Sequence, residues 1–278
     1  MIEQAVSIGN DFNLNGVVTI PDKPDQNLEA FVILNSGLMH KIGTCRISVT
    51  LARQVVKTNR IVLRFDLSGI GDSAPRATGI DDESRVCEEI ITVLDYLQTQ
   101  YGVSRFVLYG LCSGANNAFK IAQVDQRIVG LVSIDGYSYR TLKFYAVHYL
   151  PRMLKLSVWA NSFGKLFTGK KQAPTAASES IESDIDVEPE NIWPEFPPRK
   201  AVESAYQQLV DRKVRLNIIY TGSWFEIYNY HAQFKDMYSR VDFGELLTLK
   251  LYSDASHIMS EPKSQQDIIG GIVSWLDS

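Results

Sequence analysis

The bulk composition describes an ordinary globular protein and excludes several functional classes. The 278 residues are 45% hydrophobic and 22% charged, and the formal net charge is −4, so bulk electrostatics give no reason to expect nucleic acid as a partner. Three cysteines without a C-x-x-C pair argue against a disulfide framework or a thiolate metal site and suit a reducing cytoplasm.

The chain carries no pattern of a targeting or membrane segment. Its start has no basic stretch followed by an apolar run, and its apolar runs fall short of the roughly 18–20 residues that a membrane span needs. We therefore expect a soluble, cytoplasmic protein, and we expect neither a metal nor a cofactor. The sequence says nothing of its oligomeric state.

Short apolar runs rich in β-branched residues alternate with helix-period segments along the chain. The predicted strands cover residues 30–35, 60–66, 105–110, 128–135, 215–222 and 246–253. Most are apolar throughout, as expected for strands buried on both faces of a mainly parallel sheet. The alternation predicts an α/β sheet with helical crossovers, and the first 20 residues, with a turn near Asn15–Gly16, predict a leading antiparallel hairpin.

Two segments show the clearest helical periodicity of apolar residues. Residues 81–97 repeat apolar side chains at helix spacing, with Asp81 or Asp82 as N-cap, and residues 265–278 close the chain in the same manner. Cys45 and Cys87 also lie in predicted helices, so we expect both in the core.

The alternation breaks once, which divides the chain into a core of residues 1–136 and 201–278 and an insertion of residues 137–200. The first half of the insertion is aromatic and basic, and the second half is acidic and rich in Pro and Ser. We expect helices followed by a flexible acidic loop. Three interpretations stay open: a lid over an apolar substrate, contact of residues 139–171 with an anionic membrane surface, or aromatic side chains that merely pack on the core.

The segment LYGLCSGANNA, residues 108–118, contains the motif with the most chemical content. Gly110 and Gly114 flank Cys112 in the pattern G-x-C-x-G, between a predicted strand and a predicted helix. A strand-to-helix turn that lifts one side chain out of the sheet is sharp and strained, and the residues two before and two after its apex must be very small. We therefore predict a nucleophile elbow with Cys112 at its apex.

At this point the chain resembles the α/β-hydrolase fold superfamily over nearly its whole length. The segment LNSGLMHKIG resembles the family's oxyanion loop, FDLSGIGDS (65–73) its D-x-x-G-x-G-x-S segment, and SDASHIM (253–259) the stretch that supplies a histidine. The cysteine elbow is similar to those of dienelactone hydrolases and polyhydroxyalkanoate synthases, and more loosely to those of hydrolases of bacterial polysaccharide-export loci. The resemblance implies an α/β-hydrolase fold, with a mostly parallel sheet flanked by helices and an inserted helical lid.

The same resemblance implies a nucleophile, a base and an acid. Cys112 would be the nucleophile, because a helix N-terminus stabilises a thiolate and a nearby imidazole takes its proton; the alternative is a small buried side chain. His257 would be the base, unless it is an ordinary surface histidine. For the acid that orients the imidazole we favour Glu226, one residue beyond the usual position. Asp135, which ends the strand 128–135, is the second candidate.

The remaining candidates would bind the oxyanion and the substrate. The resemblance implies oxyanion donors at the backbone N–H of Ser113 and of Gly37 or Leu38. Candidate substrate contacts are His40, Tyr137, Phe144 and Trp224.

Three functions are compatible with these sequence features. The first is hydrolysis of an ester or thioester of a small acyl substrate through an acyl-enzyme on Cys112. The second is an acyltransferase or cyclase that uses the same acyl-enzyme and keeps water out. The third is a binding protein that retains the fold without the chemistry.

Overall fold

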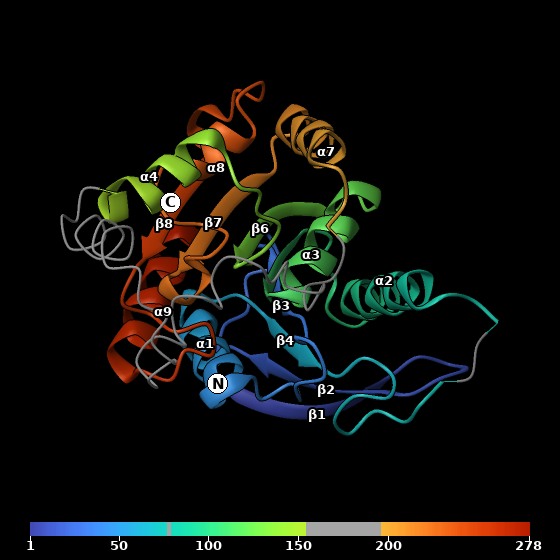
Figure 1. Ribbon diagram of the computed structural model, residues 1–278. Helices are drawn as coiled ribbons and strands as arrows, with labels where there is room; N and C mark the ends of the chain where they lie inside the picture. Colours follow the sequence, from blue (N-terminus) through green and yellow to red (C-terminus); the bar gives the residue numbers. More distant parts are fainter. Residues whose placement is uncertain (77–78, 154–195) are drawn as a thin grey trace, which may run out of the picture.

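The computed structural model describes residues 1–76, 79–153 and 196–278 of the chain. Within them, one sheet has the strand order β1-β2-β4-β3-β5-β6-β7-β8 (Figure 1). The strands are β1 (Ile2–Ile8), β2 (Leu14–Ile20), β3 (Ala30–Ile33), β4 (Val62–Phe65), β5 (Phe106–Leu111), β6 (Ile128–Ile134), β7 (Arg215–Thr221) and β8 (Leu247–Tyr252). Strands β1, β2 and β4 pair antiparallel, and every pair from β4 through β3 to β8 is parallel.

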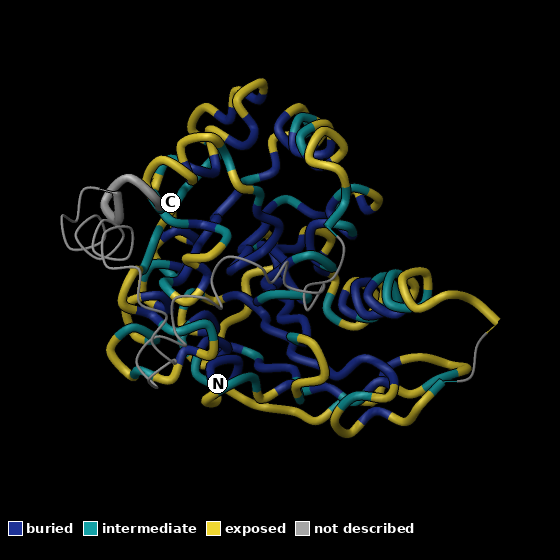
Figure 2. The backbone as a smooth tube through the Cα atoms, viewed as in Figure 1, coloured by how far each residue is buried: buried dark blue, intermediate teal, exposed yellow. Residues whose placement is uncertain are grey.

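The helices lie on both faces of the sheet. They are α1 (Ile47–Val55), α2 (Asp82–Tyr101), α3 (Ser113–Val124), α4 (Leu142–Met153), α7 (Arg199–Asp211), α8 (Gln233–Met237) and α9 (Pro262–Leu276). Helices α1 and α9 pack together on one face, with a core that includes Ile47, Val107 and Ile272. Helices α2, α3 and α7 cover the other face, with a core that includes Leu94, Leu108 and Leu209. The central strands are accordingly buried, whereas the outer faces of the helices are exposed (Figure 2).

The local reasons for these elements agree with the sequence. The apolar strands β3 and β5 are buried at every position, because helices cover both faces of the sheet. Asp81 caps α2, since its side chain accepts a hydrogen bond from the N–H of Ser84. The strand–helix alternation and the predicted strands are confirmed with their boundaries shifted by a few residues.

Two predictions about local structure are wrong. The first hairpin turns at residues 9–13, where Gly9 has φ +109°, whereas Asn15 and Gly16 lie within β2 opposite Ser7 and Val6. Cys45 is exposed in the short 3₁₀ turn η1 (Thr44–Arg46), just before α1, instead of being buried.

Cys87 lies on α2 and is half-buried, and burial raises the pKa of its thiol. None of the described helices is both long and apolar enough to cross a membrane.

Candidate active site

Cys112 lies at a sharp turn between β5 and α3. Its backbone has φ 57° and ψ −120°, a conformation that costs a non-glycine residue about 1–3 kcal/mol. A Cβ on Gly110 would approach the carbonyl of Gly114 to 2.1 Å, and one on Gly114 would approach the carbonyl oxygen of Asn35 to 2.4 Å. Gly110 therefore has the reason predicted for it, closure of the turn, whereas Gly114 lacks a side chain because the loop after β3 approaches it.

His257 lies in the loop between β8 and α9 and is held from three sides. Its Nδ1 is 2.8 Å from Oδ2 of Asp135, and its backbone N–H donates to Oγ of Ser223 at 3.1 Å. The ring of Trp224 stacks on the imidazole with centroids 5.1 Å apart and planes 11° apart. These contacts leave Nε2 as the ring nitrogen that is available for proton transfer.

Asp135 follows β6 and is fully buried, with φ 50°. Besides the imidazole, its carboxylate accepts hydrogen bonds from the N–H and the Oγ of Thr221, both at 2.7 Å. These three contacts satisfy the hydrogen-bonding capacity of a carboxylate that has no access to water. The arrangement fixes the orientation and tautomer of the His257 ring.

Glu226, the acid that the sequence favoured, is placed elsewhere. It is exposed, and its backbone oxygen accepts a hydrogen bond from Nε of Arg140 at 3.0 Å. The carboxylate in contact with His257 is that of Asp135, the second candidate. The reason is topological: β6 lies next to β5 in the sheet, so its end is adjacent to the elbow.

The electrostatics of this group favour a charged imidazole. The hydrogen bond with Asp135, followed by the hydrogen bond with the Cys112 thiol, raises the pKa of His257 to about 9 even though burial opposes both. An imidazolium beside a cysteine stabilises the thiolate, which is the nucleophilic form. The imidazolium of His257 is therefore held next to the sulfur of Cys112.

The loop after β3 lies against the start of α3. The N–H of Gly37, which has φ +53°, donates to Oγ of Ser113 at 2.6 Å. Leu38 is solvent-exposed, with 88% of its surface accessible. The loop and the elbow thus meet next to Cys112, where the sequence placed the oxyanion donors.

Buried charges anchor the same loop to the turn after β4. Nζ of Lys41 donates to Oδ2 of Asp66 at 2.7 Å and also to Asp72, and it lies 3.0 Å from Nε2 of His40. His40, Asp66 and Asp72 are close enough to share a metal ion, but the ammonium of Lys41 already contacts all three side chains. The hydrogen bonds of Lys41 and His40 lower the pKa of Asp72 to about 2. We therefore assign this cluster to holding the loop in place.

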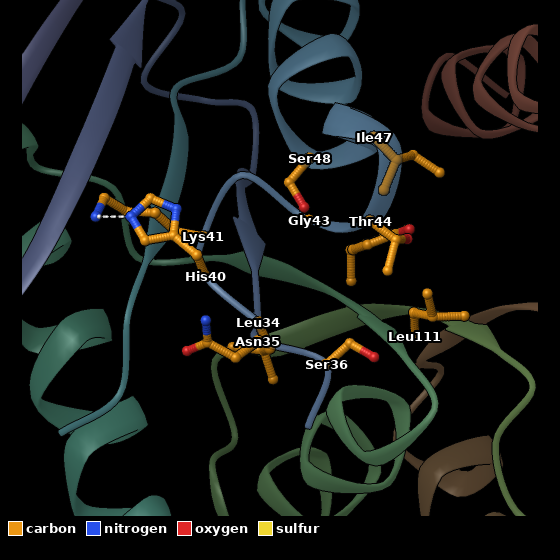
Figure 3. Close-up of a pocket in the computed structure, with 11 residues that line it drawn as sticks. Leu34, Asn35, Ser36, His40, Lys41, Gly43, Thr44, Ile47, Ser48 and Leu111 are labelled. Carbon is orange, nitrogen blue, oxygen red and sulfur yellow. Dashed lines mark hydrogen bonds between the residues drawn. The ribbon is translucent and has the colours of Figure 1, made fainter. Parts of the chain in front are cut away.

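A small pocket opens between this loop and the start of α1 (Figure 3). Polar groups of Asn35, Ser36 and Ser48 line it together with Leu111, the residue before Cys112. Its lining does not include Cys112 or His257. The pocket therefore lies next to the candidate site and is separate from it, between the loop after β3 and the start of α1.

The aromatic candidates for substrate contact are packed inside the protein. Tyr137 is 7%, Phe144 3% and Trp224 4% exposed, whereas the His40 side chain is 32% exposed at the loop. Trp224 supports the imidazole of His257 by stacking on it. Helix α4 begins the predicted lid, and the part of the lid over 154–195 lies outside the described residues.

Sequence reasoning missed the residues that hold the acid and the imidazole. Thr221 and Ser223 were not selected, although Thr221 ends the buried strand β7 and Ser223 lies two residues beyond it. A signal was present: in a parallel sheet, polar residues at the carboxyl ends of adjacent strands meet at one edge.

Comparisons with known proteins agree on the fold and on the family. Among solved structures, an esterase from Pyrococcus furiosus has a TM-score of 0.60 at 18% identity, covering 99% of this chain and 90% of that one. A putative hydrolase from Agrobacterium vitis S4 has 0.58 at 16%, covering 99% and 98%, and a proline iminopeptidase from Mycobacterium smegmatis has 0.55 at 14%, covering 99% and 98%. At these identities the likeness shows an α/β-hydrolase fold.

The search of curated proteins found no significant match. The family model described as serine aminopeptidase, S33, matches residues 26–187, which is more than half of the chain. The chain is therefore a member of the serine aminopeptidase S33 family, a family of α/β hydrolases.

Proposed function

We propose that this protein hydrolyses ester or thioester bonds of a small acyl substrate by covalent catalysis at Cys112. In this proposal His257 is the base, Asp135 is the acid that orients it, and no metal or cofactor takes part. The observation that carries the proposal is the relay from Asp135 to His257 at 2.8 Å, beside a cysteine on a strained turn.

Strain at Cys112 supports a chemical role. A residue is held at positive φ only where the surrounding structure enforces it, and such positions cluster at active sites. Cys112 is only partly buried, so a substrate can reach its sulfur.

The proposed reaction has two steps. The Cys112 thiolate attacks the carbonyl carbon, the S–C bond forms, and the bond to the leaving alcohol or thiol breaks as the His257 imidazolium gives it a proton. Water then attacks the thioester of the acyl-enzyme while neutral His257 accepts a proton from it. The C–S bond breaks, the carboxylic acid leaves, and the thiolate and imidazolium return.

The cysteine departs from the serine in the family's description. A serine hydroxyl needs a neutral imidazole to remove its proton at the moment of attack, whereas a thiol is acidic enough to be ionised beforehand. The raised pKa of His257 keeps the imidazole protonated near neutral pH and so matches the requirement of a cysteine. Thioesters are accordingly within the substrate range we propose.

Trapping of the acyl-enzyme tests the proposal. Mixing the protein with p-nitrophenyl acetate and quenching in acid should add one acetyl group, which peptide mass spectrometry should locate on Cys112. Cys45→Ala and Cys87→Ala are the matched controls and should retain it. A Cys112→Ala protein that releases p-nitrophenol at the rate of the unaltered protein would refute the covalent mechanism.

The same experiment separates the other two functions. Supplying an acetyl thioester with and without an amine or alcohol acceptor distinguishes hydrolysis from acyl transfer, because transfer gives an acetylated acceptor in place of free acetate. A protein that binds these compounds, forms no acetyl-Cys112 and releases no product would be the non-catalytic binding protein.

A further inference from the structure

One of the two backbone donors expected from the loop after β3, the N–H of Gly37, is already engaged. The N–H of Gly37 donates to Oγ of Ser113, 2.6 Å away, which is closer than the usual N–H···O separation of about 2.7–3.2 Å. An oxyanion that used Gly37 directly would have to displace this hydroxyl. Preorganised donors stabilise a transition state best when nothing has to be rearranged.

Ser113 has two hydrogen-bond donors, its side-chain O–H and its backbone N–H, that the contact with Gly37 does not use. A hydroxyl carries one hydrogen and two lone pairs, so Oγ can accept from Gly37 and still donate its own proton. Ser113 is also the first residue of α3, where backbone N–H groups lack an intrahelical partner. Both its N–H and its O–H therefore remain for a ligand beside Cys112.

We propose that the side-chain hydroxyl of Ser113 is a catalytic oxyanion donor, oriented by the N–H of Gly37 and acting together with the N–H of Ser113 itself. This inference rests on the proposed acyl-enzyme at Cys112. As negative charge develops on the carbonyl oxygen, the Ser113 O–H donates to it, and the Gly37 N–H strengthens that bond by polarising the hydroxyl. Gly37 thus acts through Ser113 as a positioning residue.

The accessibility of these groups fits the role. Cys112 and Ser113 are partly exposed and Gly37 is exposed, so an acyl group can reach all three. A Cβ at Gly37 would meet nothing within 4 Å. Crowding around that position therefore does not account for the loop conformation, whereas the hydrogen bond to Ser113 links the loop to the elbow directly.

Two variants of Ser113 test this assignment, each measured for its turnover of p-nitrophenyl acetate and for the alkylation rate of Cys112. Ser113→Ala should lower kcat for p-nitrophenyl acetate by about 10²–10³-fold with little change in KM, which is the usual loss for one oxyanion donor. Ser113→Thr keeps the hydroxyl and should recover most of the loss. Alkylation of Cys112 by iodoacetamide forms no oxyanion, so its rate should stay within twofold in both variants, and an unchanged rate also shows that the elbow is folded.

Each other outcome has a definite meaning. If Ser113→Ala turns over as fast as the unaltered protein, or faster, the loop donor is a backbone N–H and the hydroxyl of Ser113 is not needed, which overturns the assignment. If alkylation and turnover fall together, Ser113 acts on the thiolate or the fold, which overturns it too. If the unaltered protein never forms acetyl-Cys112, the failure is that of the proposed function and is recognised before any Ser113 variant is made.

Discussion

Replacing Asp135 by asparagine tests the relay most directly. The side chain keeps its size but loses its charge, and the Asp135 hydrogen bond is the largest cause of the raised pKa of His257, about 9. Without it the pKa should return toward the ordinary value of about 6.5. At pH 7.5 the protonated fraction of His257 then falls from about 97% to about 9%. Because the imidazolium stabilises the thiolate, the Cys112 thiolate population should fall about tenfold.

The assay is alkylation of Cys112 by iodoacetamide between pH 5 and 10, followed by mass spectrometry. A paired thiolate reacts well below the pKa of about 8.5 of a free thiol. In Asp135→Asn the midpoint of the rate profile should rise toward that value, and the rate at pH 7.5 should fall about tenfold. Proton NMR of His257, assigned with a His257→Gln spectrum, should show the titration midpoint moving down from about 9.

Glu226→Gln is the matched control, since it neutralises the other candidate acid on the exposed surface. It should alkylate within twofold of the unaltered protein. A Glu226→Gln variant that slows alkylation tenfold, with Asp135→Asn at the unaltered rate and both folded by circular dichroism, would refute the relay through Asp135.

Four further substitutions have expected results. Lys41→Met, which leaves buried carboxylate charge without its ammonium, should lower the free energy of unfolding by about 3–5 kcal/mol in urea titrations; a loss below 1 kcal/mol would contradict the role of this ion cluster. Gly114→Ala should destabilise by at least about 1–3 kcal/mol because of its 2.4 Å approach, whereas Gly270→Ala on the exposed face of α9 should stabilise by about 0.5–1 kcal/mol; the reverse order would refute the packing. Trp224→Leu removes the ring that stacks on His257 and should lower the NMR midpoint of that histidine by about half to one pH unit, for a contact of about 1 kcal/mol; an unmoved midpoint would show that stacking does not stabilise the imidazolium.

The fold could be predicted because its main signals are local. Strands such as β5 and β6 are buried on both faces. A continuous apolar run in the sequence therefore marked the position of each of these strands correctly. The hairpin turn was misplaced because Asn15–Gly16 is a strong turn signal. In the structure Gly16 lies instead against Leu63 and Phe65 across the strand pair, where a Cβ would be only 3.1–3.2 Å away, a requirement that only the paired strand reveals.

The acid of the site could not be selected from local spacing. Glu226 follows β7 at nearly the expected distance, but that count says nothing of where its side chain lies in space. The place of Asp135 depends on the order β5-β6-β7-β8 and on Thr221, which ends the neighbouring strand. Cys112 and His257 were easier to find, because a glycine-flanked turn and a histidine after the last strand are readable from sequence alone.

The strained turn at Cys112 gives the protein an internal reporter of its own folding. Unfolding ordinarily speeds the labelling of a thiol, and we expect this of Cys87, which is half-buried with a raised pKa. Cys112 should show the opposite behaviour, because its reactivity comes from a neighbour that only the assembled sheet brings to it. A single labelling experiment along a denaturant series would then record two opposite trends in one chain. The denaturant concentration at the midpoint of the fall in Cys112 labelling would mark the loss of the site, and comparing it with the global unfolding midpoint would show whether the site opens before the rest of the protein.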